Sequence, residues 1–224
     1  MASENYGPAA VNDAVILAAK LRYLYSLTEF LGVFGEAGGW VAPSGTYDFA
    51  RSYANGSGTA TGSGSTSGWQ GYVFGRLGLV WIPTKADEVA PAVEIGRQNL
   101  VTNSYSETLS AANPFEARIT GGSATMEVVR VRAQWSHGFT DKIDATVWGA
   151  FAEGFNAQDS TTAQVDGVGV LTPRTGSSMS WGEYGVRLGY RISNAFSAAV
   201  FVNGVAGAFG QSYAHAGGAL LVRF

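Results

Sequence analysis

The chain reads Val129-Arg130-Val131-Arg132-Ala133-Gln134-Trp135-Ser136 in its most regular stretch. Apolar residues take every odd position and polar residues every even one, so an extended chain would show one apolar and one polar face. The run 183–192 repeats this period of two. Its polar side carries Glu183, Arg187 and Arg191, and its apolar side carries Tyr184, Val186, Leu188, Tyr190 and Ile192. Both runs predict two-faced β-strands.

Seven further segments follow the same rule with more Gly and Ala: 14–27, 30–41, 70–82, 88–99, 143–154, 196–206 and 213–224. Twelve residues at ~3.3 Å each, tilted by about 45°, rise roughly 28 Å, which matches the bilayer core. The composition is 46% hydrophobic and 14% charged, yet no stretch has the roughly eighteen apolar residues that a membrane helix needs. These features predict a β-barrel in which every second residue faces lipid.

The connections between these segments differ at the two ends of the strands. Short polar ones lie at 26–29, 83–87, 140–142 and 193–195, with Asp, Asn, Ser and Thr available for local side-chain to backbone bonds. Long ones lie at 42–69, 100–122 and 155–178, and we interpret the Gly/Ser/Thr tract at 54–68 as a flexible surface loop. We therefore predict an all-β, transmembrane, antiparallel up-and-down barrel of about 8–12 strands in the bacterial outer membrane, with long extracellular loops and short periplasmic turns.

Two sets of side chains follow from this arrangement. The aromatic residues nearest the short turns are expected to form a girdle at the periplasmic interface: Tyr23, Tyr25, Trp81, Trp135, Tyr190 and Phe224. The charged residues of the polar faces are expected to line the lumen: Arg22, Glu36, Arg76, Glu94, Arg130, Arg132, Glu183, Arg187, Arg191 and Arg223. Such charges must pair or be hydrated. They form either a salt-bridge network that holds the strand register or a pore lining that a polypeptide or solute slides past.

The last strand alternates up to the final residue, with Leu220, Val222 and Phe224 on one face. A terminal Phe in such a strand resembles the signature that the barrel-assembly machinery recognises. The stretches 75–81, 92–98, 131–137 and 186–191 resemble the C-terminal translocator barrel of autotransporters, and the resemblance covers the chain from about residue 20. It implies a barrel that accompanies an N-terminal passenger in cis to the cell surface with the help of the assembly machinery.

The number of segments departs from that family, which usually has about twelve strands after a helix in the pore. Nine segments are visible, whereas single-chain bacterial barrels have even strand numbers. Either a strand lies within 1–13, or upstream strands are missing, or 14–27 is the pore helix. We divide the chain into an N-terminal extension, 1–13, and a barrel domain, 14–224, and expect a signal peptide to have been removed. The alternative function is a complete small structural, adhesin-like or porin-like barrel with ligand-binding surface loops.

Other classes of function find little support. The net charge of −3 and the lack of a basic stripe argue against nucleic acid. Cysteine is absent, and His137 and His215 have no metal-ligand spacing around them. Asp141, Asp144, Asp159 and Asp166 are better explained as residues of turns, loops and strand starts than as catalytic acids. We expect no enzyme, cofactor or metal, and as partners outer-membrane lipid, lipopolysaccharide and the assembly machinery.

Overall fold

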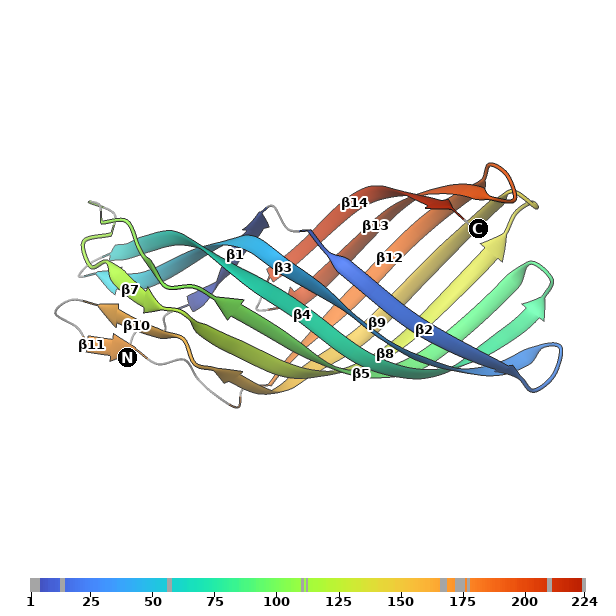
Figure 1. Cartoon of the computed structure of the whole chain (residues 1–224), viewed down its shortest axis with the longest axis horizontal. Coiled ribbons are helices and arrows are strands. Elements are labelled where there is room, and N and C mark those ends of the chain that lie inside the picture. Colours follow the sequence, from blue (N-terminus) through green and yellow to red (C-terminus); the bar gives the residue numbers. More distant parts are fainter. Residues whose placement is uncertain are drawn as a thin grey trace.

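The computed structural model describes residues 5–12, 15–55, 58–109, 111, 113–165, 169–171, 176, 178–208 and 211–222. These residues form β-strands, turns and irregular segments (Figure 1). The large sheet contains β1 (Asn5–Asn12), β2 (Leu17–Ser26), β3 (Leu31–Asn55), β4 (Gly58–Thr84), β5 (Asp87–Thr102), β8 (Gly122–Gly138), β9 (Ile143–Asp159), β12 (Met179–Arg191), β13 (Phe196–Ala208) and β14 (Gln211–Val222). Among the residues described, no helix is long and apolar enough to cross a membrane.

Every pairing in the large sheet is antiparallel, and the strands follow one another in chain order as β3-β4-β5-β8-β9-β12-β13-β14. This confirms the predicted all-β antiparallel arrangement. The segment predicted at 14–27 is strand β2, so of the two options for it the strand is correct and the pore helix is wrong.

The N-terminal residues belong to the same sheet. β1 pairs with residues 46–52 of β3 and β2 pairs with residues 32–41, so β1 and β2 lie one after the other along the same edge of β3. A strand within 1–13 was one of the three options for the odd strand count. It lengthens the edge formed by β2 and adds nothing to the width of the sheet, which is nine strands with β2 included.

The sheet is strongly curved but does not close within the described residues, because no pairing joins β2 to β14. Both edges run toward the short-turn end, as the arrowheads in Figure 1 show: β2 leads into the turn at 27–30, and β14 returns to the end at which β13 began. A direct β2–β14 contact would therefore be parallel, unlike every other pair.

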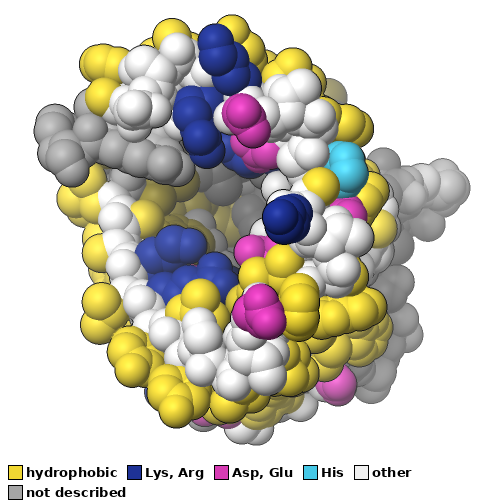
Figure 2. Space-filling view, turned by 90° about the vertical axis from the view of Figure 1, so that its right-hand side faces the viewer, with side chains coloured by type: hydrophobic (Ala, Val, Ile, Leu, Met, Phe, Trp, Pro, Cys, Tyr) yellow, Lys and Arg dark blue, Asp and Glu magenta, His cyan; other side chains and the backbone are white. Residues whose placement is uncertain are grey.

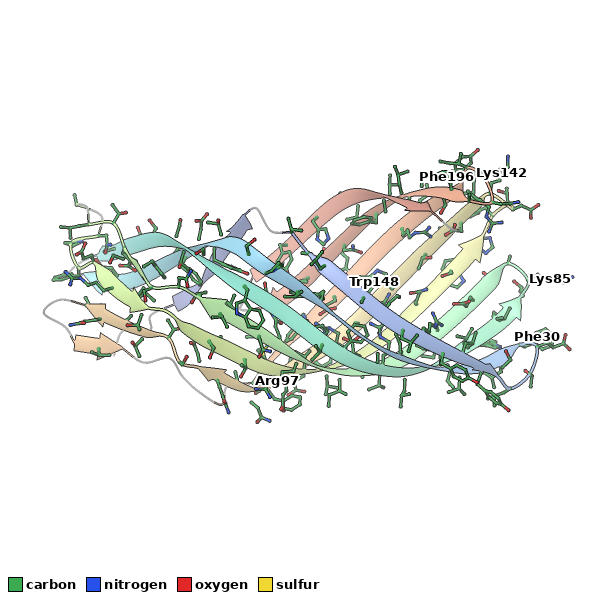
Figure 3. All side chains as sticks on the ribbon, in the orientation of Figure 1. Phe30, Lys85, Arg97, Lys142, Trp148 and Phe196 are labelled. Atoms are coloured by element: carbon green, nitrogen blue, oxygen red, sulfur yellow. The ribbon has the colours of Figure 1, made fainter. Side chains whose placement is uncertain are left out.

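The four short turns share one device and lie at one end of the sheet, where Figure 3 labels Phe30, Lys85, Lys142 and Phe196. In each, a hydroxyl accepts the backbone N–H three residues later: Thr28 from Leu31 at 3.0 Å, Thr84 from Asp87 at 3.1 Å, Thr140 from Ile143 at 3.0 Å, and Ser193 from Phe196 at 3.1 Å. The hydroxyl replaces a backbone partner that the turn cannot supply. The predicted local side-chain to backbone bonds are confirmed.

The long connections at the other end are more ordered than predicted. The interpretation of 54–68 as a flexible loop is wrong, because β3 and β4 continue as a paired hairpin through 45–55 and 58–68. Residues 56–57 of that tract lie outside the described residues. The other two connections supply a second sheet in the order β11-β10-β7-β6, built from β6 (Tyr105–Ser106), β7 (Ala117–Thr120), β10 (Thr162–Val165) and β11 (Gly169–Leu171). A Cβ on Gly64 would lie 2.6 Å from the Tyr105 ring, so the glycine permits close approach of this sheet to the hairpin.

Candidate functional site

The two faces of the large sheet carry opposite chemistry. We call the inner face the one that holds Glu36 and Glu94, and the outer face the one that holds Val93 and Val131. In an end-on view from the short-turn side, many Lys, Arg, Asp and Glu side chains surround a central hollow while hydrophobic side chains occupy much of the perimeter (Figure 2). The inner face is the candidate site because it gathers buried charge.

Five charged residues of the inner face stand directly opposite one another across five neighbouring strands. The strand register pairs Arg22 with Glu36, Glu36 with Arg76, Arg76 with Glu94, and Glu94 with Arg130, on β2, β3, β4, β5 and β8. We call this row the charge ladder. Its charges alternate in sign, so each inner member has an opposite charge on both sides.

The middle of the charge ladder is closely bonded. Arg76 Nη1 donates to Glu36 Oε1 at 2.8 Å and Arg76 Nε donates to Glu94 Oε2 at 2.9 Å, while Arg130 Nη1 donates to Glu94 Oε1 at 2.8 Å. The side chains of Glu36 and Glu94 are only 2% and 5% exposed. Such charge-assisted bonds offset the cost of burying these two carboxylates.

Arg130 extends this network across the next strand. Its opposite residue on β9 is Ala152, which is fully buried, and its Nε donates at 2.9 Å to Glu183 Oε1 on β12. The small alanine leaves room for the two longer side chains to meet. Trp181 Nε1 also donates to Glu183 Oε1, at 2.7 Å, and the Tyr72 hydroxyl donates to Glu94 Oε1 at 2.7 Å.

The remaining predicted lumen residues lie on or near this face with different partners. Arg22 stacks over the Phe34 ring at 4.2 Å. Arg132 bonds to Gln134 Oε1 at 3.0 Å, and Arg187 pairs with Asp144. Arg191 is exposed at the last position of β12. Arg223 lies outside the described residues.

The outer face is apolar and exposed. The following side chains are each at least 48% exposed: Leu77, Val93, Ile95, Val131, Phe151, Val186, Leu188, Val200, Val202 and Leu220. The predicted girdle residues Tyr23, Tyr25, Trp81, Trp135 and Tyr190 are also exposed on this sheet. Of the predicted assembly signal, Leu220 is 81% exposed, the backbone of Val222 pairs with Phe196, and Phe224 is outside the described residues.

Near the short turns the outer face ends in a small polar group. Asp87 Oδ1 accepts a hydrogen bond from Trp135 Nε1 at 3.0 Å and lies 2.8 Å from His137 Nδ1. Phe139 then packs edge-on against His137 with ring centroids 4.7 Å apart. An indole whose ring is exposed and whose N–H is bonded at one end is typical of a membrane–water interface.

The sequence analysis missed several members of the inner network. Tyr72 and Trp181 were not singled out, and Asp144 was interpreted as a residue of a strand start although it pairs with Arg187. Alternation could have assigned Tyr72 to the inner face, since it shares parity with Arg76 on β4. Within the described part of the chain, no three His, Cys, Asp or Glu side chains are placed to hold a metal ion.

The sequence matches no protein-family model and no curated protein. The resemblance to autotransporter barrels therefore stays a prediction, and the geometry above must carry the functional argument.

Proposed function

We propose that this chain forms most of the wall of a transmembrane β-barrel in a bacterial outer membrane. One observation carries the proposal, and three consecutive residues of β5 illustrate it. Glu94 is 4% exposed, whereas Val93 and Ile95 on either side are 53% and 61% exposed. A protein dissolved in water would bury the aliphatic residues and expose the carboxylate. The reversed pattern suits a wall with lipid outside and a polar interior.

The height of the apolar surface supports a single bilayer crossing. On β8 the outer-facing residues run from Trp135 near the short turns to Glu127, the next outward charge. Eight residues at ~3.3 Å with a tilt of about 45° span roughly 19 Å, close to the ~25 Å apolar band of such barrels. The short turns would then face the periplasm, and the β3–β4 hairpin extension and the second sheet would face the outside.

The direction of the two edges adds a requirement to this proposal. Because β2 and β14 run the same way, antiparallel closure needs an odd number of further strands between them, running from the short-turn end to the other. A second copy cannot supply them, because copies in the same membrane orientation have edges that run in the same direction. Antiparallel closure therefore requires a strand that the described residues do not supply.

The more specific proposal is the translocator and membrane anchor of an autotransporter, which carries a passenger in cis and is inserted by the barrel-assembly machinery. The sequence resemblance and the need for further strands support it. A second candidate is a complete small barrel with ligand-binding surface loops. The ordered connections at the end opposite the short turns favour this one: between β6 and β7, Asn113 is 1% exposed and accepts the Tyr53 hydroxyl at 2.8 Å.

Tryptophan quenching tests the inside-out arrangement. We would prepare two single-tryptophan variants, keeping either Trp135, which is 47% exposed on the outer face, or Trp181, which is 8% exposed on the inner face. After refolding into vesicles of brominated phosphatidylcholine, we expect strong quenching of Trp135 and weak quenching of Trp181. Equal quenching of the two would contradict the assigned faces.

Cross-linking in native outer membranes tests closure, and the absence of cysteine in the chain makes it clean. Leu21→Cys on β2 would be combined in turn with cysteine at Ala214, Ala216, Gly218 and Leu220 on β14. If one strand separates the edges, they lie about 10 Å apart, beyond the ~4 Å Cβ separation of a disulfide. We expect a 10 Å reagent to link one pair and no disulfide to form. Disulfide formation would show direct parallel closure instead.

The mass of the native polypeptide distinguishes the two candidates. A translocator predicts a precursor much larger than 23.4 kDa or a cleaved surface fragment, and a complete small barrel predicts a mature protein near that mass.

A further inference from the structure

Arg132 differs from Arg76, Arg130 and Arg187 on the inner face because no described carboxylate forms an ion pair with it. In the part of the chain that the structure describes, no Asp or Glu oxygen lies within 4.0 Å of a side-chain nitrogen of Arg132, the distance limit for an ion pair. Its register neighbours are the alanines Ala92 and Ala150. Its Nη2 donates to the neutral Gln134 Oε1 at 3.0 Å, and its Cζ lies 4.5 Å from the centre of the Trp148 ring. Figure 3 shows Trp148 midway along the sheet.

The nearby carboxylates are already engaged. Glu94 accepts hydrogen bonds from Tyr72, Arg76 and Arg130, and Glu183 accepts them from Arg130 and Trp181. Moving either carboxylate to Arg132 would break bonds to buried cations, which is costly. The half-buried guanidinium therefore has donors left over and, among the described residues, no carboxylate in contact with it.

A cavity of about 270 Å³ lies beside this guanidinium. Its lining combines three aromatic residues, Trp40, Tyr72 and Phe74, with Gln98 and five charged residues: Arg76, Glu94, Arg130, Arg132 and Glu183. Among the described residues, the Gln98 amide has no side-chain hydrogen-bond partner. Aromatic side chains with convergent polar donors are a usual composition of a small-molecule site. Because the two lining glutamates are bonded to Arg76 and Arg130, Arg132 is the lining cation whose donors can turn to an anionic ligand.

We propose that this cavity binds a carboxylate attached to an aromatic or flat apolar group. The planar fork of Arg132 matches a carboxylate with two parallel N–H bonds, the Gln98 amide offers a further donor, and the aromatic side chains stack on the apolar part. The carboxylate can belong to a free aromatic acid or to a polypeptide that ends in the hollow. This site does not depend on the protein's location or on a passenger.

Benzoate is the probe, and neutral benzamide is its matched control. Titration of the folded protein in detergent, followed by calorimetry and tryptophan fluorescence, should show saturable benzoate binding and much weaker benzamide binding. Arg132→Met should weaken benzoate roughly tenfold or more and leave benzamide unchanged. Arg187→Met is the matched control on β12, because Arg187 pairs with Asp144, and it should leave benzoate binding unchanged.

A peptide ending in Phe with a free carboxyl, compared with its C-terminal amide, separates the two sources. Competition by the acid alone indicates that the site also accepts a polypeptide terminus, and no competition restricts it to small acids. The proposal is overturned if the wild-type protein binds no benzoate, if benzamide binds equally well, or if R132M binds as the wild type does. Should R132M fail to fold, Gln98→Leu must weaken benzoate but not benzamide for the proposal to stand.

Discussion

Placing an arginine at Val131 tests the outer face at its most sensitive point. Val131 is 57% exposed at the tenth position of β8, four residues from Trp135 and four from Glu127. Each offset corresponds to about 9 Å of depth at ~3.3 Å per residue and a tilt of about 45°, so Val131 would lie near the midplane. An arginine on the lipid face costs roughly 2–4 kcal/mol there. The folded-to-unfolded ratio would fall by about 30-fold to nearly 1,000-fold.

The matched control is Val170→Arg. Val170 is 63% exposed in β11, in the second sheet beyond the proposed membrane, and an exposed substitution in water usually changes stability by less than about 0.5 kcal/mol. Both variants would be refolded into phosphatidylcholine vesicles and titrated with urea, with folding read from heat-dependent gel mobility. We expect a large loss for Val131→Arg and almost none for Val170→Arg. Equal losses, or no loss at Val131, would refute the lipid-facing assignment.

Two further pairs of variants test the buried polar groups. Arg130→Met removes the cation shared by the buried Glu94 and the partly buried Glu183 and should cost about 3–5 kcal/mol. Arg132→Met, two residues along the same strand, removes no ion pair and should cost less than about 1 kcal/mol. Urea titration of both variants in detergent measures the difference. Tyr53→Phe removes the hydrogen bond to Asn113 and should cost about 1–3 kcal/mol. Tyr47→Phe should be neutral or stabilising, because the Tyr47 hydroxyl is buried without a hydrogen-bond partner among the described residues. Burial also raises the pKa of its phenol. Hydrogen exchange of the β3–β4 extension distinguishes the loss expected for Tyr53→Phe from the unchanged or greater stability expected for Tyr47→Phe.

The alternation of single residues was enough to predict most of the large sheet. On β8 and β12 the apolar and polar positions read from the sequence are largely those that the structure exposes and shields, with Arg191 at the end of β12 as an exception. The short turns were equally readable, because a Thr or Ser in each turn accepts a backbone N–H three residues later. These features depend only on neighbours a few residues away.

Composition misled the sequence analysis where local signals were weak. Residues 54–68 are mostly Gly, Ser, Thr and Ala, which alone indicates a flexible loop, yet they pair with Phe49, Tyr53 and their neighbours on β3. The stabilising contact comes from Tyr105, which stacks on Phe49 at 5.6 Å and lies more than fifty residues further along the chain. No pattern within the hairpin reveals such a partner.

The pairing of the inner charges was predicted in kind but not in detail. Opposite charges on polar faces indicated a network, and the charge ladder could be drawn only once the register of five strands was known. The bond from Arg130 to Glu183 required more, since it passes over Ala152 on the strand between them. The alternation of polar and apolar residues does not indicate which intervening side chain is small enough for a bond to pass over it.

The exposed apolar face could in principle be covered by a protein partner in water, and its extent argues against this. Leu77, Val93, Val131, Phe151, Val186 and Val200, each at least 49% exposed, come from six successive strands, β4, β5, β8, β9, β12 and β13. Because the sheet curves through these strands, their outer side chains point in widely different directions around the perimeter (Figures 1 and 2). One partner would cover one side and leave the rest in water. A bilayer would contact every direction at once, and it would leave the charged residues on the inner face, where they pair with charges on neighbouring strands.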